Sequence, residues 1–175
     1  MNFFLVTLIL LLNINVLHAE NSLSERPLEP VKTKYNIPKI EYFDGTKSVN
    51  IQDGKSTFVL LNFWATWCPA CVAEMSSLDA LAKKEAKKNL KVIAVNVNEG
   101  GPSEVKAFLT KLKINKMTIL YDSNNKSSKE LAIRGLPTTF LISPDGKVLA
   151  KLEGSTNWDS LTIRSQIEKY VDISQ

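Results

Sequence analysis

The stretch TFVLLNFWATWCPAC, residues 57–71, decides the fold of this chain. Residues 57–64 are almost continuously apolar and rich in branched and aromatic side chains, which is typical of a central strand buried on both faces. Pro69 suits the first turn of a helix, where its missing N–H costs no hydrogen bond, and the helix is expected over 69–88. One face of that helix is apolar: Cys71, Met75, Leu78 and Ala82. The stretch therefore predicts a buried strand that leads directly into a helix, with two cysteines at the junction.

The residues on either side of this unit predict an alternation of strands and helices. Further strands are expected at 90–97, 117–121, 138–142 and 148–152, and further helices at 102–112, 127–133 and 158–171. Asp145-Gly146 marks a hairpin turn between the last two strands. The turn Asp44-Gly45, with apolar residues on both sides, indicates a small hairpin ahead of residue 57. The order βαβαβαββα predicts an α/β fold: a mixed central sheet flanked by helices on both faces, with an N-terminal β-hairpin extension.

The composition is that of an ordinary globular domain. The chain has 175 residues, of which 44% are hydrophobic and 23% charged, so a mainly disordered or fibrous protein is excluded. The net charge of +4 comes without a dense basic cluster. We therefore expect no nucleic-acid partner.

The first residues have the composition of a targeting segment. Residues 1–19 contain no charged side chain, and their apolar core is about ten residues long, shorter than the ~20 residues that span a bilayer. This favours a cleaved secretory signal that ends at Ala19, with an uncleaved N-terminal membrane anchor as the alternative. Residues 20–36 are polar, contain two prolines and lack periodicity, so a flexible tether is expected there. The folded domain is expected over 37–175.

The two cysteines, Cys68 and Cys71, are the residues most suited to chemistry. Two cysteines three apart at a helix N-terminus can bring their sulfurs within bonding distance, and the helix N–H groups and dipole stabilise a thiolate on the first. Cys68 is then the attacking thiolate, and Cys71, one turn further in and more shielded, resolves the mixed disulfide. The spacing therefore predicts a redox-active pair.

Three other uses of the cysteines are weighed against this one. A structural disulfide would close so small a loop that it would stabilise the fold only weakly. A zinc or copper site lacks ligands, because there is no second cysteine pair and the only histidine, His18, leaves with a cleaved signal. Two inert core cysteines would be unusual on either side of Pro69 at a strand-to-helix junction. We therefore expect no metal, and dithiol chemistry requires no organic cofactor.

Three segments together carry a family resemblance. They are residues 61–71 followed by Glu74, Gly-Leu-Pro-Thr-Thr-Phe at 135–140, and Pro-Asp-Gly at 144–146. These segments resemble the TlpA/ResA-like (DsbE/CcmG-like) thiol–disulfide oxidoreductases, which are exported bacterial members of the thioredoxin superfamily. The resemblance extends over residues 36–172 and implies a thioredoxin-like fold. Many relatives have a proline where this chain has Ser76, which predicts a softer helix kink or none.

The resemblance also implies roles for individual residues. Pro137 matches the family's cis-proline, which would expose the backbone of Leu136 for pairing with an extended client segment. The client-binding residues implied in this way are Trp67, Pro69, Leu136 and Pro137. Trp64, in contrast, is expected to pack in the core.

Glu74 is the third candidate catalytic residue beside the two cysteines. In the ResA-like branch a glutamate at this position acts as a proton acceptor near the cysteines, and a part-buried carboxyl would have the raised pKa that this role needs. The alternative is an acid placed near the start of the helix because the dipole favours it there. Asn62 stands where cytosolic thioredoxins carry a buried aspartate, which shifts any carboxylate role to Glu74.

The activity expected from the resemblance is that of an exported protein-disulfide oxidoreductase. Its partners would be client proteins with disulfides or dithiols, and a membrane thiol donor that re-reduces it. The family favours a reductant in the periplasm or another extracytoplasmic compartment, serving cytochrome c maturation or the assembly of an oxidase copper site. A net oxidant or isomerase is an alternative of the same class. A redox-silent module that binds peptides at Leu136 and Pro137 is an alternative of another class.

Overall fold

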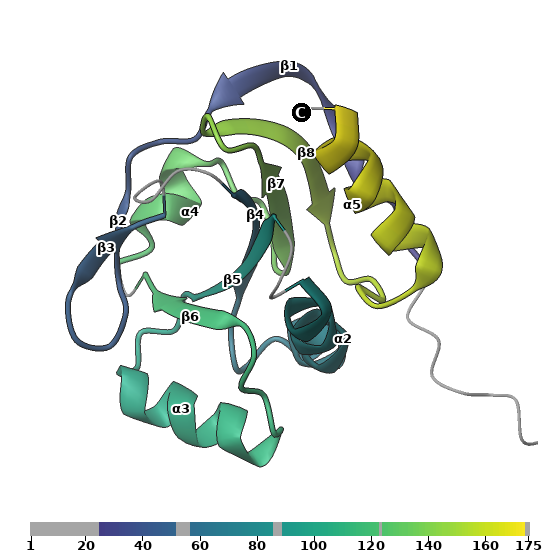
Figure 1. Ribbon diagram of the computed structural model, residues 1–175. Coiled ribbons are helices and arrows are strands. Elements are labelled where there is room, and N and C mark those ends of the chain that lie inside the picture. The colour runs from purple at the N-terminus through teal and green to yellow at the C-terminus, as the bar shows by residue number, and fades with distance from the viewer. Residues whose placement is uncertain (1–24, 52–56, 86–88, 123, 174–175) are drawn as a thin grey trace, which may run out of the picture.

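Figure 1 shows the computed structural model of the protein, which describes residues 25–51, 57–85, 89–122 and 124–173. Its strands are β1 (Glu29–Asn36), β2 (Glu41–Phe43), β3 (Ser48–Asn50), β4 (Phe58–Trp64), β5 (Leu90–Asn96), β6 (Thr118–Tyr121), β7 (Thr138–Ile142) and β8 (Lys147–Glu153). Its helices are α2 (Pro69–Glu85), α3 (Pro102–Lys111), α4 (Lys126–Glu130) and α5 (Leu161–Ile173). Each strand and helix expected from residue 37 onward is therefore present, with ends that differ by a few residues.

The strands form one mixed sheet in the order β1-β8-β7-β4-β5-β6-β2-β3. β4 lies in its middle, parallel to β5 and antiparallel to β7, and all seven residues of β4 are buried. This confirms the central strand that the unbroken apolar run predicts. β5 is in turn parallel to β6. The predicted α/β fold with a mixed central sheet is confirmed.

Helices cover both faces of the sheet. The connections through α2 and α3 step in the same direction along the sheet, and because such crossovers are right-handed, both helices cover the same face. Trp64 of β4 accordingly packs in the core against Phe108 of α3, with their ring centroids 6.3 Å apart. α5 lies beside α2 on this face, and α4 lies on the other side of the sheet (Figure 1).

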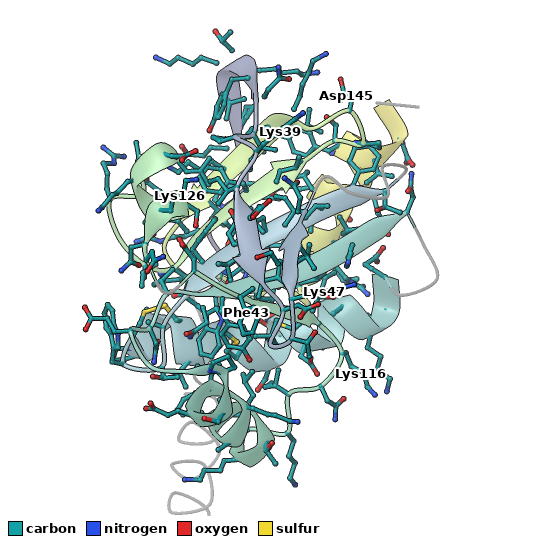
Figure 2. All side chains as sticks on the ribbon, turned by 90° about the vertical axis from the view of Figure 1, so that its left-hand side faces the viewer. Lys39, Phe43, Lys47, Lys116, Lys126 and Asp145 are labelled. Carbon is teal, nitrogen blue, oxygen red and sulfur yellow. A yellow bond between two sulfur atoms is a disulfide. The ribbon has the colours of Figure 1, made fainter. Side chains whose placement is uncertain are left out.

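The predicted hairpin, β2 and β3, extends the sheet beyond β6. The turn between the two strands includes Gly45 at φ 101°, a conformation that favours glycine. Asp44 supports this turn, because its Oδ1 accepts two backbone N–H groups. Phe43 pairs with Tyr121 of β6, and Figure 2 shows Phe43 and Lys47 on the exposed side of the hairpin. The hairpin is therefore an addition to one edge of the thioredoxin-like sheet.

The prediction of a flexible tether over 20–36 is wrong for its second half. Residues 29–36 form β1, which pairs antiparallel with β8 at the other edge of the sheet, and Leu28 is buried. Nearly all side chains of β1 are exposed, so the strand carries no periodic apolar signal. Its composition, with Pro30 and two lysines, is typical of an edge strand. The signal or anchor predicted over 1–19 lies outside the described residues.

Candidate active site

The cysteine pair lies where β4 passes into α2. The N–H of Cys68 donates to the carbonyl of Ala65 (3.2 Å), and the carbonyl of Cys68 accepts the N–H of Val72 (3.1 Å). Pro69 takes the first helical position, as its sequence context predicts. Cys68 is therefore the capping residue of α2, at the end of the helix where backbone N–H groups lack intrahelical partners. The helix then runs without interruption through Ser76 to Glu85.

Cys68 and Cys71 form a disulfide, with their Cα atoms 5.3 Å apart. The two residues differ in exposure: Cys68 keeps 6% of its surface, whereas Cys71 keeps none. The backbone N–H of Cys71 donates to Sγ of Cys68 over 3.2 Å, and a donor in this place stabilises negative charge on that sulfur. The pair can therefore perform dithiol–disulfide exchange, with Cys68 nearer the surface and Cys71 fully shielded.

Asn98 holds the turn before Cys68, and sequence reasoning missed it. Its Oδ1 accepts the N–H of Thr66 (3.0 Å), and its Nδ2 donates to the hydroxyl of Thr66 (2.6 Å). Asn96, at the end of β5, makes two further bonds with Asn98. Because β4 and β5 are parallel neighbours, a polar residue that follows β5 reaches the turn that follows β4. The position of Asn98 directly after a buried strand is the only signal of this role in the sequence.

The Leu136–Pro137 peptide bond is cis, as the resemblance implies. Pro137 immediately precedes β7, and because Phe63 pairs with Thr138, the proline lies at the carboxyl end of β4. This is the end of the sheet from which the chain continues to the cysteines. Trp67 is 69% exposed, and it lines the same pocket of about 520 Å³ as Leu136. The structure thus brings the predicted client-binding residues Trp67 and Leu136 to one hollow at the active-site end of the sheet.

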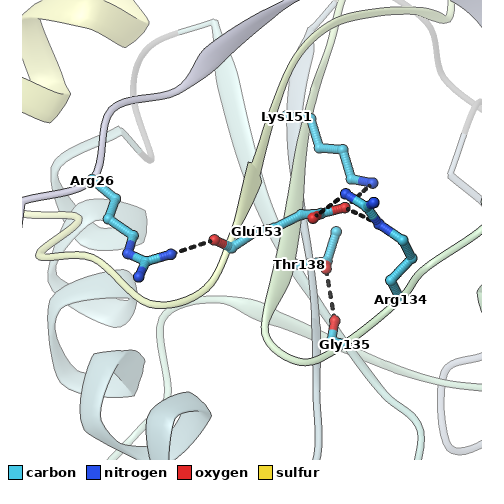
Figure 3. Close-up of polar contacts among 6 residues, drawn as sticks. All are labelled: Arg26, Arg134, Gly135, Thr138, Lys151 and Glu153. Atoms are coloured by element: carbon cyan, nitrogen blue, oxygen red, sulfur yellow. Dashed lines mark hydrogen bonds and ion pairs between the residues drawn. The ribbon is translucent and has the colours of Figure 1, made fainter.

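The loop that contains Pro137 is fixed at both ends, as the close-up in Figure 3 shows in part. The hydroxyl of Thr138 donates to the carbonyl of Gly135 over 2.7 Å. The N–H of Gly154, at the end of β8, donates to the carbonyl of Pro137 over 2.8 Å. These bonds leave the loop backbone in one defined shape beside the hollow.

Glu153 of β8 gathers three cations next to the same loop (Figure 3). Arg134 contacts both of its carboxylate oxygens (2.7 and 3.4 Å), and Lys151 Nζ lies 2.6 Å from Oε1. Arg26 donates to the backbone carbonyl of Glu153 over 3.2 Å. Hydrogen bonds from Arg134 and then from Lys151 lower the pKa of the Glu153 carboxyl to about 2. Arg134 is largely exposed and Glu153 partly so, and their ion pair therefore stabilises the fold only slightly.

Glu74 is completely buried, on the face of α2 that packs against the sheet. Its Oε1 accepts a hydrogen bond from Asn62 Nδ2 (2.8 Å). Its Oε2 accepts one from the backbone N–H of Thr156 (3.1 Å) and one from Trp158 Nε1 (2.8 Å). The sequence predicted a part-buried carboxyl but none of these partners. Trp158, which was expected to begin the terminal helix, instead lies in the turn ahead of α5, where its side chain is buried against Glu74.

Burial raises the pKa of the Glu74 carboxyl from 4.5 to about 7, although the bonds from Trp158, Thr156 and Asn62 oppose that rise. The direction is the one that a proton-accepting role requires. The alternative, an acid placed by the helix dipole, does not fit, because Glu74 lies beyond the first turn of α2 and has no surface in water. Glu74 therefore changes its charge near neutral pH.

Two features are absent from the described residues. In residues 25–51, 57–85, 89–122 and 124–173, no three His, Cys, Asp or Glu side chains gather in a way that could hold a metal ion. In the same part of the chain, no helix has the length and apolar character needed to cross a membrane.

Comparison with known proteins gives the family. The model of the redoxin family matches residues 32–169. A thiol-disulfide oxidoreductase ResA from Bacillus thuringiensis subsp. konkukian is 32% identical over 125 residues, which cover 71% of this chain and 68% of the relative. A thiol:disulfide interchange protein DsbE from Vibrio cholerae serotype O1 is 31% identical over 143 residues, or 79% of this chain and 75% of the relative.

Among solved structures, a candidate thiol:disulfide interchange protein DsbE from Chlorobium tepidum matches with a TM-score of 0.68 and 25% identity. The match covers 83% of this chain and 98% of that one. The matched family model, the sequence relatives and the structural neighbour all agree with the family whose motifs the cysteine segment carries. The chain belongs to the redoxin family, as a TlpA/ResA/DsbE-like member of the thioredoxin superfamily, and is a protein-disulfide oxidoreductase.

Proposed function

We propose that the protein reduces disulfides in client proteins through the dithiol of Cys68 and Cys71. The observation that carries this proposal is the disulfide between Cys68 and Cys71 at the start of one helix, where Cys68 keeps a small exposed surface and Cys71 keeps none. Cys68, which lies nearer the surface, meets the client, and the fully buried Cys71 completes the exchange without competition from other thiols.

The reaction starts from the reduced dithiol. The thiolate of Cys68 attacks one sulfur of the client disulfide, which forms a mixed disulfide and releases the other client sulfur as a thiolate that takes up a proton. Cys71 then loses its proton and attacks Sγ of Cys68, so that the bond between Cys68 and the client breaks. The client leaves as a dithiol and the enzyme keeps the disulfide, after the transfer of two electrons to the client.

Glu74 accepts the proton of Cys71 in this scheme. Cys71 has no exposed surface, so its proton requires an acceptor inside the protein. Glu74 lies three residues further along α2, on the same face of the helix. A carboxyl with a pKa of about 7 can take this proton and return it to solvent near neutral pH.

The client binds next to the cysteines in an extended conformation. The backbone of Leu136, before the cis bond to Pro137, supplies the edge for a short strand addition. Trp67 lines the same hollow as Leu136, and its exposed indole gives an apolar contact to client side chains, with Pro69 two residues further along the chain.

The compartment and the clients belong to the proposal as well. The names ResA and DsbE of the relatives support an extracytoplasmic reductant, with residues 1–19 as a secretory signal or a membrane anchor. Clients of cytochrome c maturation or of copper-site assembly in an oxidase fit this role. A membrane-bound thiol protein then returns the enzyme to the dithiol state.

Reduction of insulin disulfides tests the dithiol mechanism. The wild-type protein should catalyse the reaction and Cys68→Ser should not; equal activity in both would overturn the proposal. Cys71→Ser is the matched variant, because it can form the mixed disulfide but cannot resolve it. It should hold clients that dithiothreitol releases, whereas the double variant with Cys68→Ser should hold none.

Equilibration with glutathione buffers tests the direction of the reaction. A reductant requires a reduction potential well below that of DsbA-type oxidants, which lies at about −120 mV. A potential close to that of these oxidants would refute the reductant role and leave a net oxidant.

A further inference from the structure

Asn62 has a hydrogen-bond pattern that leaves one end of its amide unused. The side chain lies in the centre of the sheet, fully buried, and faces α2. Its Nδ2 donates to Glu74 Oε1 (2.8 Å) and to the hydroxyl oxygen of Thr139 in β7 (2.9 Å). Among the described residues, its Oδ1 has no hydrogen-bond partner. A buried carbonyl oxygen without a partner is costly and calls for an explanation.

The two oxygens of Glu74 have partners of different kinds. Oε2 accepts bonds from the backbone N–H of Thr156 and from Trp158 Nε1, and neither group can accept a proton. A proton on Oε2 would therefore face two N–H donors. Oε1 has the amide of Asn62 as its partner, and an amide can present either a donor or an acceptor. When Glu74 is protonated, the proton consequently belongs on Oε1.

A protonated Oε1 cannot coexist with the amide orientation of the ionised form, because the O–H of Glu74 would face the N–H of Asn62. Rotation of the Asn62 amide by half a turn removes this conflict. Its Oδ1 then accepts from Glu74 and also from the hydroxyl of Thr139, which changes from acceptor to donor by rotation of its hydrogen. In each charge state of Glu74, one end of the Asn62 amide makes two hydrogen bonds and the other end makes none. This explains why Oδ1 has no partner when Glu74 is ionised.

We propose that Asn62 is a positioning residue whose amide reverses its orientation when Glu74 gains or loses a proton. This inference rests on the proposed role of Glu74 as the acceptor of the Cys71 proton. The reversal provides a hydrogen bond to both charge states of Glu74, so that the buried carboxyl can exchange a proton without a donor–donor clash. It also assigns the transferred proton to Oε1.

The surroundings of Glu74 allow the reversal to be observed by itself. The side chains that bond to its carboxyl come from β4 (Asn62) and from the segment after β8 (Trp158). In the disulfide form none of them titrates near neutral pH, and no charged side chain contributes to the raised pKa of Glu74. A change of the amide with pH in the oxidised protein therefore reports the Glu74 proton alone.

Neutron diffraction from deuterium-exchanged crystals of the oxidised protein at pH 5 and pH 9 tests the inference, because it distinguishes Nδ2 from Oδ1 directly. We expect Oδ1 towards Glu74 at pH 5 and Nδ2 towards it at pH 9. In solution, the ¹⁵N signal of the Asn62 amide should shift with the same midpoint as the ¹³C signal of the Glu74 carboxyl. One orientation at both pH values, or a Glu74 carboxyl that does not titrate between pH 5 and 9, would overturn the proposal.

Two controls make the result specific. Asn98 has partners at both ends of its amide, through the N–H and the hydroxyl of Thr66, so its orientation should be the same at both pH values. Glu74→Gln keeps a neutral side chain that offers an N–H to Asn62, so Asn62 should present Oδ1 at pH 5 and at pH 9 alike. Both experiments use the disulfide form, in which no client reacts. Their failure is thus separate from a failure of the insulin assay, which tests the redox proposal.

Discussion

Replacement of Glu74 by glutamine should remove a pH dependence from the stability of the oxidised protein. The folded protein holds the Glu74 proton more tightly than the unfolded chain, because burial raises the pKa from 4.5 to about 7. The stabilisation linked to this proton is complete below pH 4.5 and is lost as the pH rises through 7. The interval between the two pKa values corresponds to about 3 kcal/mol, at about 1.36 kcal/mol per pH unit.

Urea unfolding of the disulfide form at several pH values between 4 and 8.5 measures this effect. All other titrating groups are shared by the wild type and Glu74→Gln, so they cancel in the difference between their free energies of unfolding. Relative to Glu74→Gln, the wild type should lose about 3 kcal/mol of its free energy of unfolding between the lowest pH and the highest. A difference that stays constant within about 0.5 kcal/mol would refute the reasoning, because it would mean that folding leaves the carboxyl's proton affinity unchanged.

Three further predictions concern single side chains. Trp158→Phe removes the indole donor to Glu74 Oε2 and keeps an aromatic ring. The pKa of the Glu74 carboxyl should therefore rise by about one further unit. A ¹³C titration of Glu74 that shows no rise would contradict this. The indole of Trp67 is exposed, so Trp67→Ala should lower kcat/KM for a protein client by about tenfold or more. The rate with a small aromatic disulfide should stay unchanged. An equal loss for both substrates would argue against contact between Trp67 and the client. Asp79 accepts the backbone N–H groups of residues 115–117, so Asp79→Ala should lower the free energy of unfolding by about 2–4 kcal/mol. Urea unfolding measures this loss, and a loss below about 1 kcal/mol would contradict the prediction.

The cysteine segment was predictable because its signals are local. The apolar run of β4, the first-turn proline and the cysteine spacing each follow from fewer than twenty residues, and the structure places β4 and α2 within a few residues of the prediction. The cis bond before Pro137 could be anticipated only through the family, since no local pattern requires it.

The surroundings of Glu74 were not predictable in the same way. Its donors Thr156 and Trp158 stand 82 and 84 residues further along the chain. They reach it because β7 returns beside β4 and β8 beside β7, so the pattern depends on the register of the whole sheet. The strand β1 was missed for a related reason: its exposed side chains carry no periodic signal, and it exists through pairing with β8.

The pairing of β1 with β8 also decides where the chain enters the domain. Glu29 pairs with Lys151, and the N–H of Arg26 donates to Thr156, whose own N–H reaches Glu74. The chain thus enters the domain at the end of the sheet that carries the cysteines. If the protein is anchored in a lipid bilayer through residues ahead of Arg26, this end of the sheet is the one nearest the anchor. Cys68 would then lie on the side of the domain from which a membrane-bound electron donor approaches.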